Sequence, residues 1–170
     1  DKYIKELIIL KLKKYYEFVK GEEYKNSLIN LTITYGYSDF IEMLSRIALE
    51  KVVERIREIS EQGKVRILFN EEVKINNKKG DLLKTCDVIL FTNETVEVIR
   101  IVPMELDIIN VNNDDESMIL GIGVIDKFAT QMDCKYINLT VIQPNLITTS
   151  IYETSINKFL HEYDFSLIWS

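Results

Sequence analysis

Residues 95–102 read Thr-Val-Glu-Val-Ile-Arg-Ile-Val and are followed by Pro103. β-Branched side chains dominate this run, which is typical of a strand inside a sheet. Proline has no backbone N–H to give to a neighbouring strand, so Pro103 ends the run. We therefore predict that residues 95–102 form the central strand of a sheet.

Three further strands are predicted around this one. Residues 64–75 alternate apolar and polar side chains with a period of two. Residues 86–91 lead into the central strand through a short hairpin linker. Residues 136–143 form a last apolar run, which Pro144 ends. Together these segments predict a mixed four-stranded sheet.

Apolar residues recur with helical spacing before and after the predicted strands. An extra helix comes first, a long helix precedes the sheet, a third helix precedes the last strand, and a short helix follows it. The predicted ranges are 3–20, 39–62, 115–132 and 155–163. Residues 28–37 are β-prone, but a short apolar run of this kind is also compatible with a helix. The fold class is therefore α/β (α+β), with helices flanking the sheet.

Individual residues mark the helix ends and one helix surface. Asp39 is the predicted N-cap of the second helix, with Glu42 in the reciprocal capping-box position, and Ser155 is the predicted cap of the last helix. Gly121 and Gly123 lie inside the third helix, where each costs about 1 kcal/mol relative to alanine. Such glycines indicate a close approach, and we expect them where this helix contacts the sheet.

Composition excludes several classes of protein. With 46% hydrophobic and 28% charged residues the chain is predicted to fold, and a net charge of −6 with a pI near 5.0 argues against binding nucleic acid through overall charge. Direct nucleic-acid binding is therefore expected to be weak or absent. No stretch has the length and apolarity of a membrane span, and Cys86 and Cys134 are too far apart for a zinc or disulfide framework. We predict a soluble, cytoplasmic protein without membrane contact.

Five short pieces resemble a known nuclease family. They are Thr85-Cys86-Asp87-Val88-Ile89, Val96-Glu97-Val98-Ile99, Asn112-Asn113 with Met118 and Gly123, Val141-Ile142-Gln143-Pro144-Asn145-Leu146 and Tyr152-Glu153-Thr154-Ser155. They are similar to the pieces TADAVI, LEVIDLK, ENNPQLMLYALGAL, IVQPRL and TWEIS of a phage-associated, RecB-like family of the PD-(D/E)XK nuclease superfamily. The resemblance implies a PD-(D/E)XK-like core within a single domain over 1–170, with residues 1–37 as a helical extension and 38–165 as a degenerate nuclease-like core.

The departures from the family pattern bear on activity. In such nucleases an acidic residue on one strand and a D/E-x-K motif on the next hold a divalent metal and orient the attacking water. Asp87 matches the first acid, but the D-x-K places are Arg100 and Val102, and the family's glutamine on the following helix is Glu116. The resemblance thus implies a lost active site, with no catalytic residue, no metal and no cofactor. We expect Asp87 and Arg100 to form a salt bridge instead, and the competing interpretation is that Arg100 only reaches solvent.

The alternative is an active DNA nuclease whose Mg²⁺ or Mn²⁺ site has been rewired. Its ligands would be Asp87, Glu116 and an acidic neighbour such as Glu71 or Glu72.

An acidic stretch between residues 105 and 116 is the candidate binding surface. It carries five carboxylates and no lysine or arginine; they are Glu105, Asp107, Asp114, Asp115 and Glu116. These groups suit a metal site, an imitation of phosphate charge toward a basic partner, or an ordinary solvated loop and helix start.

The expected function is that of a catalytically inactive, nuclease-like protein-binding module of phage or mobile-element origin. The expected partner is a protein such as a host nucleic-acid-binding complex of the defence machinery, which the module would inhibit. A structural subunit of a phage recombination or packaging complex is a further alternative. The sequence leaves the oligomeric state open.

Overall fold

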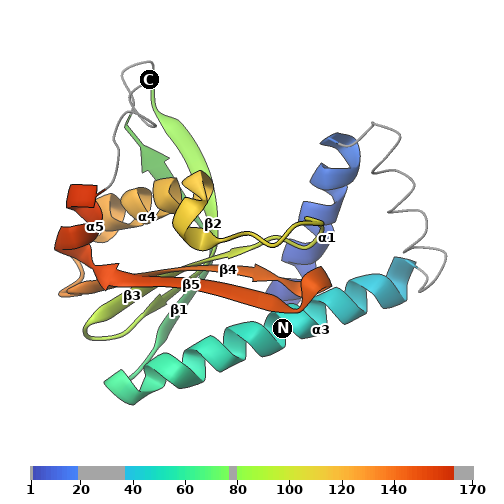
Figure 1. Ribbon diagram of the computed structural model, residues 1–170, viewed down its shortest axis with the longest axis horizontal. Coiled ribbons are helices and arrows are strands. Elements are labelled where there is room, and N and C mark those ends of the chain that lie inside the picture. Colours follow the sequence, from blue (N-terminus) through green and yellow to red (C-terminus); the bar gives the residue numbers. More distant parts are fainter. Residues whose placement is uncertain (1, 19–36, 77–79, 163–170) are drawn as a thin grey trace. The chain divides into compact units, whose positions relative to one another are not determined.

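The computed structural model describes residues 2–18, 37–76 and 80–162 (Figure 1). The chain divides into two compact units. The N-terminal unit comprises Asp1–Val53, Ile101–Ile108 and Ile142–Thr148, and the sheet unit comprises Glu54–Arg100, Ile109–Val141 and Thr149–Ser170. The predicted single domain, with its extension over residues 1–37 and core over 38–165, stays a prediction.

The sheet has five strands, one more than predicted, in the order β1-β2-β3-β4-β5. Their bounds are β1 Arg66–Ile75, β2 Leu82–Phe91, β3 Thr95–Ile101, β4 Tyr136–Gln143 and β5 Thr148–Ser155. The predicted central strand is confirmed, because β3 lies between β2 and β4. The prediction missed β5 because this edge strand reads TTSIYETS, in which apolar and polar residues do not alternate.

The sheet is mixed, as expected. β1 pairs with β2 and β2 pairs with β3 in antiparallel fashion, with Val88 opposite both Phe69 and Ile99. The start of β4 lies beside the start of β3, since the Tyr136 N–H donates to the Glu94 carbonyl at 3.0 Å. The ends of the same two strands also meet, since the Val102 N–H donates to the Ile142 carbonyl at 2.8 Å. Start meeting start and end meeting end make β3 and β4 parallel.

The helices follow the predicted order with shifted ends. They are α1 Lys2–Phe18, α3 Tyr37–Ile59, α4 Asp115–Phe128 and α5 Ile156–Glu162. Because α3 begins at Tyr37, Asp39 lies in its first turn, and the predicted Asp39 cap is wrong. The Ser155 cap is confirmed, since its hydroxyl accepts from the Lys158 N–H at 3.1 Å. Of the β-prone segment 28–37, only Tyr37 lies within the described residues.

The two glycines of α4 lie where the helix meets the sheet, as predicted. A Cβ atom added to Gly121 would lie 2.9 Å from a methyl carbon of Leu139 on β4. One added to Gly123 would lie 2.7 Å from Ile75 and 2.8 Å from Val73, both on β1. Real Cβ atoms do not approach carbon this closely, so a larger residue at either position would force the contacting side chains of the sheet to move.

The N-terminal unit buries the predicted apolar stripe of α1. Ile4, Leu7, Ile8 and Leu12 are each no more than 4% exposed. Lys5 of α1 forms an ion pair with Glu42 of α3. Glu42 therefore links the two helices and does not complete the predicted capping box. No helix within residues 2–18, 37–76 and 80–162 is long and apolar enough to cross a membrane.

Candidate functional site

Arg100, which the resemblance aligns with a metal-binding aspartate, lies on β3. Its Nε and Nη2 atoms donate to the two carboxylate oxygens of Asp114 at 3.0 and 2.9 Å. The Ser117 hydroxyl donates to the same carboxylate at 2.5 Å. The side chains of Arg100 and Asp114 are 20% and 12% exposed, so this bidentate pair is largely shielded from water.

The predicted salt bridge between Asp87 and Arg100 is therefore wrong, because Arg100 pairs with Asp114. Asp114 immediately precedes α4, where the helix dipole favours a negative charge, and it presents both oxygens to the planar guanidinium. Asp87 is buried, at 4% exposure, and has interactions of its own. The competing interpretation, an Arg100 that only reaches solvent, fails for the same reason.

Two of the acids predicted for a rewired nuclease site have cationic neighbours. Glu116 on α4 lies 3.2 Å from the Lys84 ammonium, and Glu71 on β1 lies 2.8 Å from that of Lys127. Among the described residues, no group of three or more His, Cys, Asp and Glu side chains is arranged to hold a metal. The geometry thus joins Glu71 and Glu116 to lysines and does not gather them around a shared ion.

Cys86 lies beside these acids and is fully buried. Burial raises the pKa of its thiol to about 12, and the negative charges of Asp87 and Glu71 act in the same direction. Lys127 opposes them only in part. This thiol therefore stays protonated at neutral pH and is not a nucleophile.

A second arginine–carboxylate cluster in the sheet unit was not predicted. Arg55 of α3 donates from Nε and Nη2 to Glu97 of β3 at 2.8 and 2.6 Å, and Asn138 of β4 donates to Glu97 at 3.0 Å. Arg55 and Glu97 are 4% and 0% exposed. Burial by itself disfavours the charge on Arg55, but the hydrogen bond and charge of Glu97 outweigh it and raise the pKa of Arg55.

This cluster lies on the face of the sheet opposite to α4. Asn138 points toward Glu97 and Arg55, and its neighbours Ile137 and Leu139 point toward Gly121 of α4. The sequence contained a signal for the cluster. Arg55 falls between Val52 and Ile59 on the apolar stripe of its helix, and Glu97 interrupts an apolar strand. Two unlike charges in such places predict a buried pair.

The comparisons with known proteins identify a family for this arrangement. The family model described as "Protein of unknown function (DUF2800)" matches residues 3–165. The chain belongs to this family. One solved structure, "Crystal structure of SSO0001", is 16% identical over 95% of this chain and 79% of that chain, with a TM-score of 0.39. A likeness at that level carries no conclusion about this chain. The comparison with curated proteins finds no match.

The acidic stretch of this DUF2800 protein is divided between the two units. Asp114 and Glu116 belong to the sheet unit and pair with Arg100 and Lys84. Asp115 is exposed in the same unit. Glu105 and Asp107 belong to the N-terminal unit. The five carboxylates are thus described unit by unit.

Glu105 and Asp107 belong to an exposed segment that combines charge with apolar surface. Leu106 and Ile108 in the same segment are 55% and 72% exposed. Two side-chain amides hold the backbone of this segment. Asn145 donates to the Glu105 carbonyl and Gln143 to the Asp107 carbonyl, each at 2.8 Å. We call residues 105–108 the ELDI segment. Among the described residues, neither of its carboxylates has an ion-pair partner.

Proposed function

We propose that this DUF2800 protein is a catalytically inactive PD-(D/E)XK-like domain that works by binding another protein. The pair between Arg100 and Asp114 carries the proposal. A guanidinium held in place by two hydrogen bonds supplies a permanent positive charge at the position where PD-(D/E)XK nucleases have a metal ligand. A metal cation bound there would lie a few ångströms from this charge, and like charges repel strongly when they are shielded from water.

The second D-x-K position supports the same conclusion. Val102 carries an apolar side chain, which can neither donate a proton nor stabilise a developing negative charge. Glu116, in the place of the family's helix glutamine, is engaged by Lys84. A divalent metal would therefore meet one matching acid, Asp87, together with a fixed cation.

We take the ELDI segment as the contact surface of the module. Its apolar side chains, Leu106 and Ile108, offer area that gains free energy when a partner covers it. Its carboxylates, Glu105 and Asp107, select a partner with a basic surface, because complementary charge speeds association and disfavours wrong partners. Proteins that handle nucleic acids have such surfaces.

Because the resembled family is phage-associated, we assign the partner to a host nucleic-acid-handling complex of the defence machinery, which the module would inhibit. A structural role in a phage recombination or packaging complex is the competing assignment. That role requires a stable and largely apolar interface.

The first experiment tests catalysis. The purified protein is incubated with single-stranded and double-stranded DNA in the presence of Mg²⁺ or Mn²⁺, beside the variant Asp87→Ala. We expect no cleavage above background with either metal. Metal-dependent cleavage by the unaltered protein that disappears in Asp87→Ala would establish the rewired nuclease in place of the inactive domain.

The second experiment tests the binding surface. Proteins that co-purify with the chain from its native host are identified, and the binding of the purified partner is then measured over a salt series. We expect the double variant Glu105→Gln/Asp107→Asn to bind at least about tenfold more weakly and to lose most of the salt dependence.

The control for that experiment is Glu50→Gln/Asp126→Asn, which removes the same charge from exposed positions on α3 and α4. It should bind like the unaltered protein. If the affinity does not change with salt and is the same in both double variants, the contact is not selected by charge. That result would favour the structural role in a phage recombination or packaging complex.

A further inference from the structure

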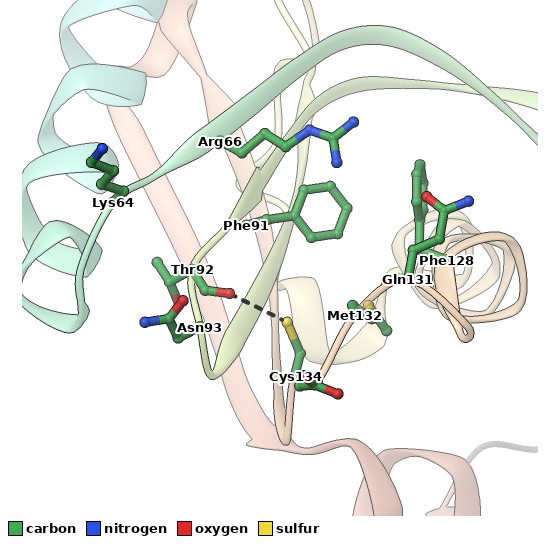
Figure 2. A pocket seen from close by; sticks show the side chains of 10 residues that line it. Lys64, Arg66, Phe91, Thr92, Asn93, Phe128, Gln131, Met132 and Cys134 are labelled. Atoms are coloured by element: carbon green, nitrogen blue, oxygen red, sulfur yellow. Dashed lines mark hydrogen bonds between the residues drawn. The ribbon is translucent and has the colours of Figure 1, made fainter.

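A pocket of about 300 Å³ lies in the sheet unit, where β1 begins, β2 ends and the chain leaves α4 (Figure 2). This is the lower end of the volume range of small-ligand sites. Its lining includes neither the residues compared with a nuclease active site (Asp87, Arg100, Val102 and Glu116) nor the ELDI segment. The residues that carry the argument are Lys64, Arg66, Phe91, Asn93, Phe128 and Gln131.

Two aromatic rings form the apolar part of the pocket. The centroids of Phe91 and Phe128 are 5.1 Å apart, with their planes at 66°. Phe128 is buried and holds Phe91 by this edge-to-face contact. Phe91 is half-buried and keeps part of its surface open to the pocket. A fixed, partly open ring is a platform for a planar ligand.

Cations lie next to that platform. The guanidinium carbon of Arg66 is 5.9 Å from the centroid of Phe91, and Figure 2 shows the side chain extending along the ring toward Gln131. Lys64 lines the pocket from the segment before β1, and in Figure 2 its ammonium points away from the ring. Asp133 is the acid among the lining residues, so the lining is net positive in a chain whose net charge is −6. Arg66 and Lys64 are both exposed and able to reorient toward an anion.

Amide side chains complete the set. Asn93 and Gln131 are exposed and lie on opposite sides of the pocket in Figure 2. Each offers a donor and an acceptor, which is the combination that the edges of a nucleobase require. An aromatic platform, two cations and two amides in one pocket match a ligand that is planar, polar at its edges and anionic.

We propose that this pocket binds a phosphorylated nucleoside. The base stacks on Phe91 and hydrogen-bonds through its edges to Asn93 and Gln131, and the phosphate is held by Arg66 and Lys64. The ligand has two sources with the same chemistry, namely a free nucleotide and the phosphorylated terminal nucleotide of a single strand. The site is independent of the proposed protein-binding function, because it uses neither the Arg100–Asp114 pair nor the ELDI segment.

The test is a titration of the ¹⁵N-labelled full chain with adenosine monophosphate, followed by NMR. We expect shifts in the amides of residues 64–66, 91–93 and 131–134, and none in α1. Adenosine without the phosphate, and inorganic phosphate without the base, should each bind at least about tenfold more weakly, because each lacks one half of the contacts.

Matched variants locate the two halves of the site. Arg66→Ala should weaken binding of adenosine monophosphate at least about tenfold, and Arg57→Ala, which removes an exposed arginine from α3, should leave it unchanged. Phe91→Leu should weaken the binding of adenosine monophosphate and leave the weak binding of inorganic phosphate unchanged. Because Arg66 is exposed, its replacement leaves the fold intact, and the remaining amide signals verify this.

A 5′-phosphorylated single-stranded oligonucleotide and its unphosphorylated counterpart distinguish the two sources. Tighter binding of the phosphorylated strand than of the mononucleotide, at the same amides, assigns the site to strand ends; binding of the mononucleotide alone assigns it to free nucleotides. The proposal is overturned if neither ligand shifts the pocket amides at millimolar concentration, or if Arg66→Ala and Arg57→Ala bind alike.

Discussion

The sheet unit contains two bidentate arginine–carboxylate pairs that are alike in chemistry and different in surroundings. Arg55 and Glu97 are 4% and 0% exposed, whereas Arg100 and Asp114 are 20% and 12% exposed. The first pair connects α3 to the central strand inside the apolar layer, and the second connects the same strand to the residue before α4. Burial, and not the contact itself, sets what the loss of one partner costs.

The buried pair of Arg55 and Glu97 has more additional polar partners than the pair of Arg100 and Asp114. Asn138 donates to Glu97, and Arg55 also faces Glu58 and, at 3.7 Å, Glu153. Around Asp114, the additional donor is the Ser117 hydroxyl. We infer that the first cluster maintains the fold and that the second mainly sets the local charge.

The largest expected effect tests the buried pair. Arg55→Met leaves Glu97 charged and without its main partner in the interior, and we expect a loss of about 3–5 kcal/mol in the free energy of unfolding, measured by urea denaturation. Arg57→Met, an exposed arginine on the same helix, should change stability by less than about 0.5 kcal/mol. Equal effects of the two variants would mean that the buried pair contributes no more than a surface charge.

A smaller effect is expected at the second pair. Arg100→Met leaves Asp114 with Ser117 and partial access to water, so the loss should be about 1–3 kcal/mol. Adding Asp114→Asn should recover part of it. A double-mutant cycle should show coupling between Arg100 and Asp114 that exceeds the coupling between Arg100 and Asp87. The reverse order would restore the pairing that the sequence suggested.

Alkaline pH offers a test of the interior near the second pair. The pKa of Cys86 is raised to about 12 in the folded protein, above its ordinary value of 9.0. Well below pH 9 the thiol is protonated in both states, so its ionisation does not contribute to the pH dependence of stability. Between pH 9 and 12 the unfolded chain releases a proton that the folded chain retains, so stability falls by up to about 1.4 kcal/mol for each pH unit.

The variant Cys86→Ala should be less stable at neutral pH but should lose this additional alkaline slope. The comparison of the two slopes, and not of absolute stability, isolates the contribution of the thiol. Parallel curves for the two proteins would show that Cys86 is not shielded from water.

The smallest effect is expected at the exposed pair between Lys84 and Glu116, whose side chains are 33% and 39% exposed. Glu116→Gln should cost less than about 1 kcal/mol, and the difference should disappear in concentrated salt. A cost that survives high salt would place this pair with the buried cluster.

Local patterns in the sequence were sufficient for much of the fold. The strand predicted at residues 95–102, the apolar run ending at Pro144, the glycines of α4 and the Ser155 cap were all found, the strand ending one residue earlier than predicted. Each is decided by neighbours within a few positions along the chain, through side-chain alternation, a missing backbone N–H or a capping hydroxyl.

Only the tertiary structure decided the remaining features. β5 is an edge strand without alternation, and its pairing depends on β4 being present beside it. Arg55 meets Glu97 across 42 positions of the chain, and Arg100 chooses Asp114 over its predicted partner Asp87. Local periodicity indicates which side chains turn inward, but the partner of a buried charge depends on which helix is packed over which strand, and that is a property of the folded chain as a whole.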